Sequence, residues 1–178
     1  MFKIVNSGKL PTKGSKYSAC VDVYANETII IGAGETVMIG LGIAIDDELL
    51  VKSIPMKRYA MAFDETLHAE SEQYYKDVIH NFMESHYLQL MLRSSLGKSG
   101  LMLPNGVGII DLDYKDEIKM IIHNPIDYVT FHNEDYSQYT INKGDRIGQI
   151  TLLEHKAYLF GIESEDERVG GFGSSGKN

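Results

Sequence analysis

The feature that most constrains the fold of this chain is an alternating apolar pattern in residues 28–45. From position 37 onward, every second residue is a large aliphatic one, namely Val37, Ile39, Leu41, Ile43 and Ile45. Side chains two positions apart lie on the same face of an extended chain, so this spacing predicts β-strands. The step Gly32-Ala33-Gly34 interrupts the pattern and predicts a hairpin or a tight corner.

Similar patterns elsewhere in the chain predict further short strands. They lie at residues 87–93, 107–110, 117–123, 128–132 and 147–153. Turn residues separate these segments, and no internal repeat is visible. Short strands joined by turns are typical of a β-barrel or a β-sandwich, so we expect a mainly β fold.

Residues 46–86 break the strand pattern and read largely as a helical insertion. Asp64 can cap a helix whose apolar stripe has three- and four-residue spacing, formed by Tyr74, Tyr75, Val78, Ile79, Phe82 and Met83. One interpretation is a helix packed on the barrel or at a subunit contact. The other is a device that binds a partner protein, since insertions in loops often carry such functions.

Composition narrows the class of protein. A chain of 178 residues is the size of one domain, here residues 1–178. Its net charge of −8 argues against stable nucleic-acid binding, which usually requires a basic face, although a local cluster of cations can still bind a small anion. We expect no membrane segment or export signal, because no apolar run approaches about 18 residues. The single cysteine suits a reducing compartment, so we expect a cytoplasmic protein, or host cytoplasm for a viral one.

Two polar segments could carry chemistry. RSSLGKSG, residues 93–100, offers a guanidinium, hydroxyls and glycines, which suit phosphate oxygens, but it also reads as a polar strand end. DLDYKDE, residues 111–117, follows an apolar strand, so Asp111 could act as a general base for water. An acidic turn that merely faces solvent remains the alternative.

Three further segments are ambiguous when taken singly. Asp22 in SACVDVYA could face solvent or anchor the water shell of a metal ion. In KGDRIGQI, residues 143–150, Arg146 could pair with an aspartate or with phosphate. GGFGSSG, residues 170–176, could close over a ligand or belong to a flexible glycine-rich arm at 164–178. No histidine or cysteine spacing predicts a zinc site.

The order of these five segments resembles that of the trimeric dUTP diphosphatase family. The matching segments are SACVDVYA, LRSSLG, NGVGIIDLDY, KGDRIGQI and GGFGSSG, and the resemblance covers roughly residues 17–45 and 87–176. It implies a dUTPase-type jelly roll, a homotrimer whose active sites each use several subunits, and the hydrolysis of dUTP to dUMP and pyrophosphate. Limiting uracil incorporation into DNA and supplying dUMP would follow from that activity.

The resemblance also implies roles for single residues. Asp111 would activate the water that attacks the α-phosphorus. Tyr114 would pack beneath the deoxyribose, and Asn105 and Gly108 would line the uracil pocket. The phosphates would be held by Arg93, Ser94, Ser95 and Gln149.

Other implied roles concern the metal and the arm. Asp22 would bind, through water, a Mg²⁺ that the triphosphate itself holds. Phe172 would cover the uracil, while Ser174 and Ser175 would contact phosphates. Arg168 would reach the γ-phosphate, although it lies one residue nearer GGFG than is usual in the family.

The sequence departs from the family pattern at Cys20 and Asp116, where glycine is usual, and at Leu92, where proline is usual. A dCTP deaminase is a related alternative, but it needs a glutamate where this chain has Ile121. A second alternative is a dUTP-responsive regulator that binds a protein partner through residues 46–86.

Overall fold

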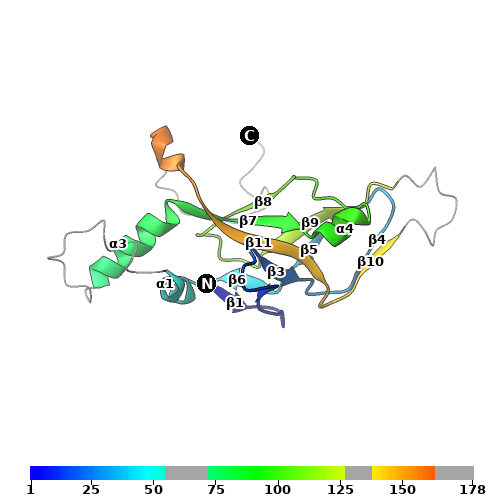
Figure 1. Cartoon of the computed structure of the whole chain (residues 1–178), viewed down its shortest axis with the longest axis horizontal. Helices are drawn as coiled ribbons and strands as arrows, with labels where there is room; N and C mark the ends of the chain where they lie inside the picture. Colours follow the sequence, from blue (N-terminus) through cyan, green and yellow to red (C-terminus); the bar gives the residue numbers. More distant parts are fainter. Residues whose placement is uncertain (55–71, 127–137, 163–178) are drawn as a thin grey trace.

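The computed structural model describes residues 1–54, 72–126 and 138–162, and it is mainly β with few helices, as the sequence predicts (Figure 1). Its largest element is a five-stranded antiparallel sheet of order β2-β3-β11-β7-β8. The strands span Thr12–Lys13 (β2), Val21–Tyr24 (β3), Arg146–Glu154 (β11), His86–Leu92 (β7) and Gly108–Asp111 (β8).

The other strands pair two by two and also antiparallel. The pairs are β1 (Phe2–Ile4) with β6 (Ile43–Ile45), β5 (Thr36–Gly40) with β9 (Lys119–His123), and β4 (Ile29–Ile31) with β10 (Tyr139–Ile141). Because β4 and β5 pair with different, distant strands, the glycine step between them forms a tight corner and not a hairpin. Gly34 adopts a φ of 69° there, a conformation that favours glycine.

The core lies between one face of the large sheet and the β5–β9 pair. Leu88, Leu90 and Ile150 from the sheet are buried, as are Ile39 and Met120 from the pair. Every second residue of a strand points to the same face of the sheet. The apolar alternation that predicted these strands therefore also determines which face of each strand is buried.

Two helices lie in the described part of residues 46–86, namely 46–54 and 72–86. The first, α1 (Asp47–Ser53), was not predicted; Asp46 caps it by accepting a hydrogen bond from the Leu49 amide at 3.0 Å. The second, α3 (Glu72–Met83), confirms the predicted helix for the described residues, whereas the predicted cap Asp64 lies outside them.

Part of the apolar stripe on α3 packs against the strands. Val78 and Phe82 are 1% and 3% exposed, and the Phe82 ring stacks on His86 with 4.1 Å between centroids. The described part of the stripe is therefore used in packing within this chain. None of the described helices is long and apolar enough to cross a membrane.

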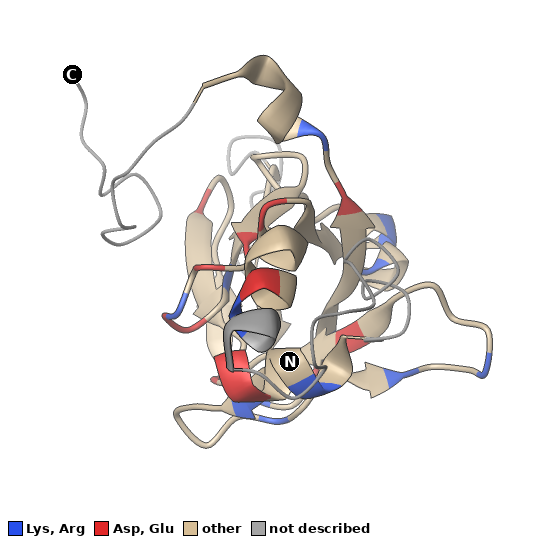
Figure 2. Ribbon diagram, turned by 90° about the vertical axis from the view of Figure 1, so that its left-hand side faces the viewer, with Lys and Arg blue, Asp and Glu red and all other residues tan. Residues whose placement is uncertain are grey.

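Other predictions differ from the structure or lie outside it. The segment after β7 is not a polar strand end but a short helix, α4 (Ser94–Lys98). A short 3₁₀ helix, η1 (Ala157–Phe160), follows β11 and projects from the strands (Figure 2). The strand predicted at 128–132 and the arm at 164–178 lie outside the described residues.

Candidate functional site

One face of the five-stranded sheet carries three rows of side chains, because directly opposite residues in antiparallel strands point the same way. The rows are Asp22, Gln149 and Met91, then Thr151, Gln89 and Ile109, then Leu153, Tyr87 and Asp111. Here this face is called the outer face. It holds three of the residues singled out from the sequence, Asp22, Gln149 and Asp111.

At one end of the outer face, cationic and amide groups surround the carboxylate of Asp22, which is 4% exposed. Arg146 Nη1 and Gln149 Nε2 donate to its two oxygens at 3.2 Å each, and Arg93 Nε lies 3.7 Å away. A buried carboxylate needs such partners. We call these four residues the arginine cluster. Its two guanidiniums outnumber its one carboxylate, which gives an excess positive charge suited to an anion.

The segment that follows the cluster presents backbone and hydroxyl donors. Arg93 lies at the N-cap of α4, without a side-chain capping hydrogen bond, and Ser94 and Ser95 form the first, exposed positions of that helix. Unfilled N–H groups at a helix start favour negative charge. The structure thus places Arg93, which Ser94 and Ser95 follow in the chain, beside Asp22 and Gln149. Arg93, Ser94, Ser95 and Gln149 are the residues expected to hold phosphates, and Asp22 is the one expected to bind a metal ion through water.

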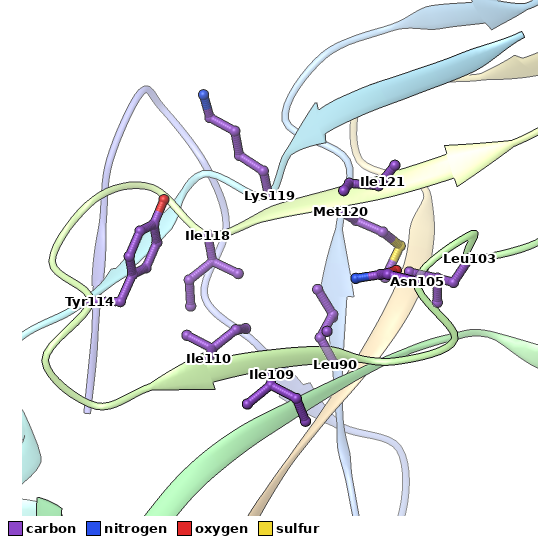
Figure 3. A pocket seen from close by; sticks show the side chains of 11 residues that line it. Leu90, Leu103, Asn105, Ile109, Ile110, Tyr114, Ile118, Lys119, Met120 and Ile121 are labelled. Carbon is purple, nitrogen blue, oxygen red and sulfur yellow. The ribbon is translucent and has the colours of Figure 1, made fainter. Parts of the chain in front are cut away.

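A pocket of about 280 Å³ opens beside β8 and β9 (Figure 3). Its lining includes Asn105, Gly108 and Tyr114, the three residues predicted to contact the base and the sugar. The rest of the lining is largely aliphatic. A cavity with apolar walls and a few polar groups fits a small, flat ligand.

Gly108 allows close packing between β7 and β8. A Cβ at this position would lie only 3.1 Å from Cβ of Leu90. The neighbouring Gly106 has a φ of 73° in the turn that carries Asn105. Glycine at both positions therefore shapes this wall of the pocket.

The acidic turn at residues 111–117 borders the same pocket. Asp111 ends β8 and is exposed, and its carbonyl accepts a hydrogen bond from the Tyr114 amide at 3.1 Å. Asp116, where the family usually has glycine, has an ordinary φ: only Asn6 and Ser7 have positive φ among the described non-glycine residues. The replacement of glycine by Asp116 is thus compatible with this turn.

Within one chain, the predicted site residues form two separate groups. Arg93 follows the last residue of β7, whereas Asp111 pairs with Tyr87 near its start. Six residues of extended chain span about 20 Å. Asp111 therefore lies far from Arg93 of the same chain.

The remaining predicted residues are not placed. Arg168, Phe172, Ser174 and Ser175 lie outside the described residues. Arg146 was not among the predicted site residues. Its spacing in KGDRIGQI was the available signal, and the structure selects the pairing with an aspartate that this spacing left open.

Comparisons with known proteins agree on one family. The sequence profile of the dUTPase family matches residues 61–176. The deoxyuridine 5'-triphosphate nucleotidohydrolase of Debaryomyces hansenii is 30% identical over 176 residues, covering 95% of this chain and 81% of the relative. That of Kluyveromyces lactis is also 30% identical, covering 96% and 88%.

Solved structures show the same fold. The dUTPase from Streptococcus mutans aligns with a TM-score of 0.56 at 20% identity, over 92% of this chain and 98% of the other. The dUTPase from phage phi11 of S. aureus aligns with a TM-score of 0.60 at 18% identity, over 98% and 97%. With a pocket, an acidic turn and an arginine cluster where the ordered motifs put them, the chain belongs to the dUTPase family.

Proposed function

We propose that this protein hydrolyses dUTP to dUMP and pyrophosphate by attack of an Asp111-activated water on the α-phosphorus. The observation that carries the proposal is the presence, on one fold, of a cationic cluster and of a small pocket beside the turn that contains Asp111. The first suits a triphosphate and the second suits a uracil nucleoside. Family membership supplies the reaction class, since the named relatives act on deoxyuridine 5'-triphosphate.

We further propose that the active site forms between copies of the chain, in a homotrimer with a jelly-roll subunit. The separation of about 20 Å between Asp111 and Arg93 along β7 supports this assembly, because these two residues of one chain cannot both contact the same α-phosphate. In a closed ring, the pocket of one subunit would meet the arginine cluster of the next. Each site would then contain Asp111 from one copy and Arg93 from another.

In this site, positioning of the α-phosphate and of the attacking water would account for much of the rate enhancement. Arg93, Ser94, Ser95 and Gln149 would bind the triphosphate and hold the α-phosphate near Asp111 of the adjoining subunit. Asp111 would orient the water and accept its proton as the P–O bond forms. Pyrophosphate leaves when the bond between the α-phosphorus and the bridging oxygen breaks. Arg168, Phe172, Ser174 and Ser175 are proposed to close over the nucleotide.

Mg²⁺ is the proposed cofactor, and the described residues fit an ion that the triphosphate brings. They contain no group of three or more histidine, cysteine or acidic side chains placed to hold a metal by themselves. Asp22 already accepts hydrogen bonds on both oxygens, but each oxygen has a second lone pair for a metal-bound water. When bound, Mg²⁺ would offset phosphate charge. The dUTPase of phage phi11 coordinates a structural Mg(II) ion.

The decisive experiment follows pyrophosphate release from dUTP, dCTP, dTTP and UTP with Mg²⁺, for the wild-type chain and for Asp111→Asn. We expect selective turnover of dUTP and a loss of about 10³-fold in the variant, the scale of removing a positioned general base. Equal rates on dTTP, or comparable turnover by the variant, would contradict the proposal. Ammonia release from dCTP would instead identify a deaminase, for which the apolar Ile121 in the pocket wall supplies no proton carrier.

A second role in protein binding is supported by one contact. Lys115, inside the acidic turn, pairs with Asp47 of α1 and so connects residues 46–86 to the site. A partner bound at this region could respond to nucleotide. The test is to delete this region. A variant that keeps full dUTP hydrolysis but no longer binds a protein partner captured by the wild type would support this role. If the wild type binds no partner with or without dUTP, the role is refuted.

A further inference from the structure

The carboxylate of Glu117 is bound by three donors from three distant parts of the chain. Its Oε2 accepts from Asn6 Nδ2 at 2.8 Å, and its Oε1 accepts from the Gly42 amide at 2.8 Å and from Asn26 Nδ2 at 3.3 Å. Among the described residues, no salt bridge to Glu117 is present. The side chain is therefore oriented by directional N–H donors, which fix position more closely than a flexible cation does.

Glycines leave the space that this carboxylate occupies. A Cβ at Gly40 would lie 2.6 Å from Glu117 Oε1, and Gly42 has a φ of 64°. Gly42 also packs on the backbone of Gly8, where an added Cβ would lie 2.2 Å from the Gly42 carbonyl oxygen. The loop after β1 and the turn between β5 and β6 therefore pack closely against each other and hold the Glu117 carboxylate in one position.

The backbone of Glu117 in turn holds Tyr114. The phenol hydroxyl of Tyr114 donates to the Glu117 carbonyl at 3.2 Å, and the hydroxyl end of the ring points toward the segment that leads into β9 (Figure 3). The next residue, Ile118, is bonded through both its amide and its carbonyl, to Ile43 and Leu41 at 2.9 Å each. The ring is thereby fixed at both ends, since its own amide is bonded to Asp111.

We propose that Glu117 is a positioning residue that sets the plane of Tyr114 and through it the rejection of ribose. The inference rests on the proposed function, in which Tyr114 packs beneath the deoxyribose. A protein surface excludes an added hydroxyl group only where the atoms of that surface cannot move away to make room for the hydroxyl. Without the carboxylate contacts, the peptide group that carries the Glu117 carbonyl is held only through the Ile118 amide. The Tyr114 ring then gains room to shift, and a 2′-hydroxyl is accommodated.

The experiment compares kcat/KM for dUTP and UTP in the wild type, Glu117→Gln and Glu117→Ala, well below the unfolding temperature of each. We expect the dUTP preference to fall about tenfold in Glu117→Ala, the order of effect for a slightly displaced contact. Glu117→Gln keeps one acceptor oxygen and should lie between the two. Glu27→Ala is the matched control, since exposed Glu27 lines the same groove of about 510 Å³ as Glu117.

Two further measurements separate a positioning role from a merely structural one. In a Tyr114→Phe background, Glu117→Ala should lower the dUTP preference no further, because the hydroxyl that links the two residues is absent. Hydrogen exchange, which needs no turnover, should show faster exchange of the Tyr114 and Ile118 amides in Glu117→Ala.

The outcomes are distinguishable. A wild-type chain that does not select dUTP refutes the proposed function itself. A selective wild type whose preference survives Glu117→Ala overturns only the role of Glu117, even if stability falls. An equal loss of preference with and without the Tyr114 hydroxyl also overturns it, because the effect would not pass through that ring.

Discussion

At the scale of single residues, Asp22 shows how a buried charge can prepare a binding site. Its carboxylate orients Arg146 and Gln149 and lies within 3.7 Å of Arg93. Side chains that are already held lose less freedom when a ligand arrives. In the proposed site, the cluster would therefore hold its donors in place for a triphosphate before any nucleotide is bound.

Replacing Asp22 by alanine should destabilise the protein as well as weaken binding. Breaking a buried ion pair leaves uncompensated cations, but Arg146 is about half exposed, so we expect a loss of about 2 kcal/mol in the free energy of unfolding. Urea unfolding measures the change. Asp22→Asn, which keeps the shape and one acceptor oxygen, should lose less. A change within about 0.5 kcal/mol for Asp22→Ala would mean that solvent already screens the pairs.

The backbone contact between Gly8 and Gly42 gives a second prediction. An alanine Cβ at position 8 would lie 2.2 Å from a backbone oxygen, which cannot rotate away, so Gly8→Ala should lower stability by roughly 3 kcal/mol. Gly97→Ala is the control, because nothing lies within 4 Å of its added Cβ in α4. The control should be neutral or slightly stabilising in the same thermal melts. Equal effects of the two changes would contradict the close approach.

At the scale of elements, the sequence predicted strands well and their partners poorly. The alternation at residues 37–45 and the apolar run before Glu154 correspond to β5, β6 and β11. Side-chain period identifies a strand but contains no information on which distant strand completes its hydrogen bonds. The corner at Gly32–Gly34 is the clearest case, because local residues permit both a hairpin and a corner.

Short helices were also difficult to predict. The five residues of α4 are too few for an apolar stripe, and its start at Arg93 has no capping side chain. Asn105, Gly108 and Tyr114, which the sequence grouped together, do share a pocket, although their roles stay predictions. The separation between Asp111 and Arg93 depends on strand register, which the side-chain pattern of a single strand does not contain.

The packing of α3 gives a prediction at this scale. Phe82 is 3% exposed and stacks on His86, so Phe82→Ala should cost about 3 kcal/mol of stability in chemical unfolding. His80→Ala on the same helix, where the side chain is 72% exposed, should change stability by less than about 0.5 kcal/mol. A loss below about 1 kcal/mol for Phe82→Ala would show that α3 is only loosely attached.

At the scale of the whole molecule, apolar surface remains for contacts between copies. Ile109 and Leu153 are 57% and 36% exposed on the outer face. Apolar residues in and after η1 are more exposed still, with Phe160 at 77% and Ile162 at 85%. Clustered exposed apolar side chains usually mark an interface. Burial against further copies of the chain is consistent with the proposed trimer.

Mixing two inactive variants tests whether sites form between subunits. Asp111→Asn and Arg93→Ala should each be nearly inactive, but coexpressed chains should recover activity, because some sites combine Arg93 of one subunit with Asp111 of its neighbour. Random mixing in a ring gives about a quarter of the wild-type activity. Pyrophosphate release by the mixed protein, compared with each variant alone, measures the recovery. No recovery in verified mixed trimers would place both residues of a working site on one chain.

The strand pairing has a consequence for how and when this protein folds. β1 pairs with β6 across about 40 residues, but β3 pairs with β11, β5 with β9, and β4 with β10, each across about 80 residues or more. Contacts between distant segments slow folding, because long loops must close before the contacts can form. On the ribosome, β3 to β5 emerge long before their partners, and the large sheet that contains β3 stays incomplete until β11 is synthesised. Acquisition of the folded state should therefore be late and cooperative, with no stable folded fragment from the first hundred residues.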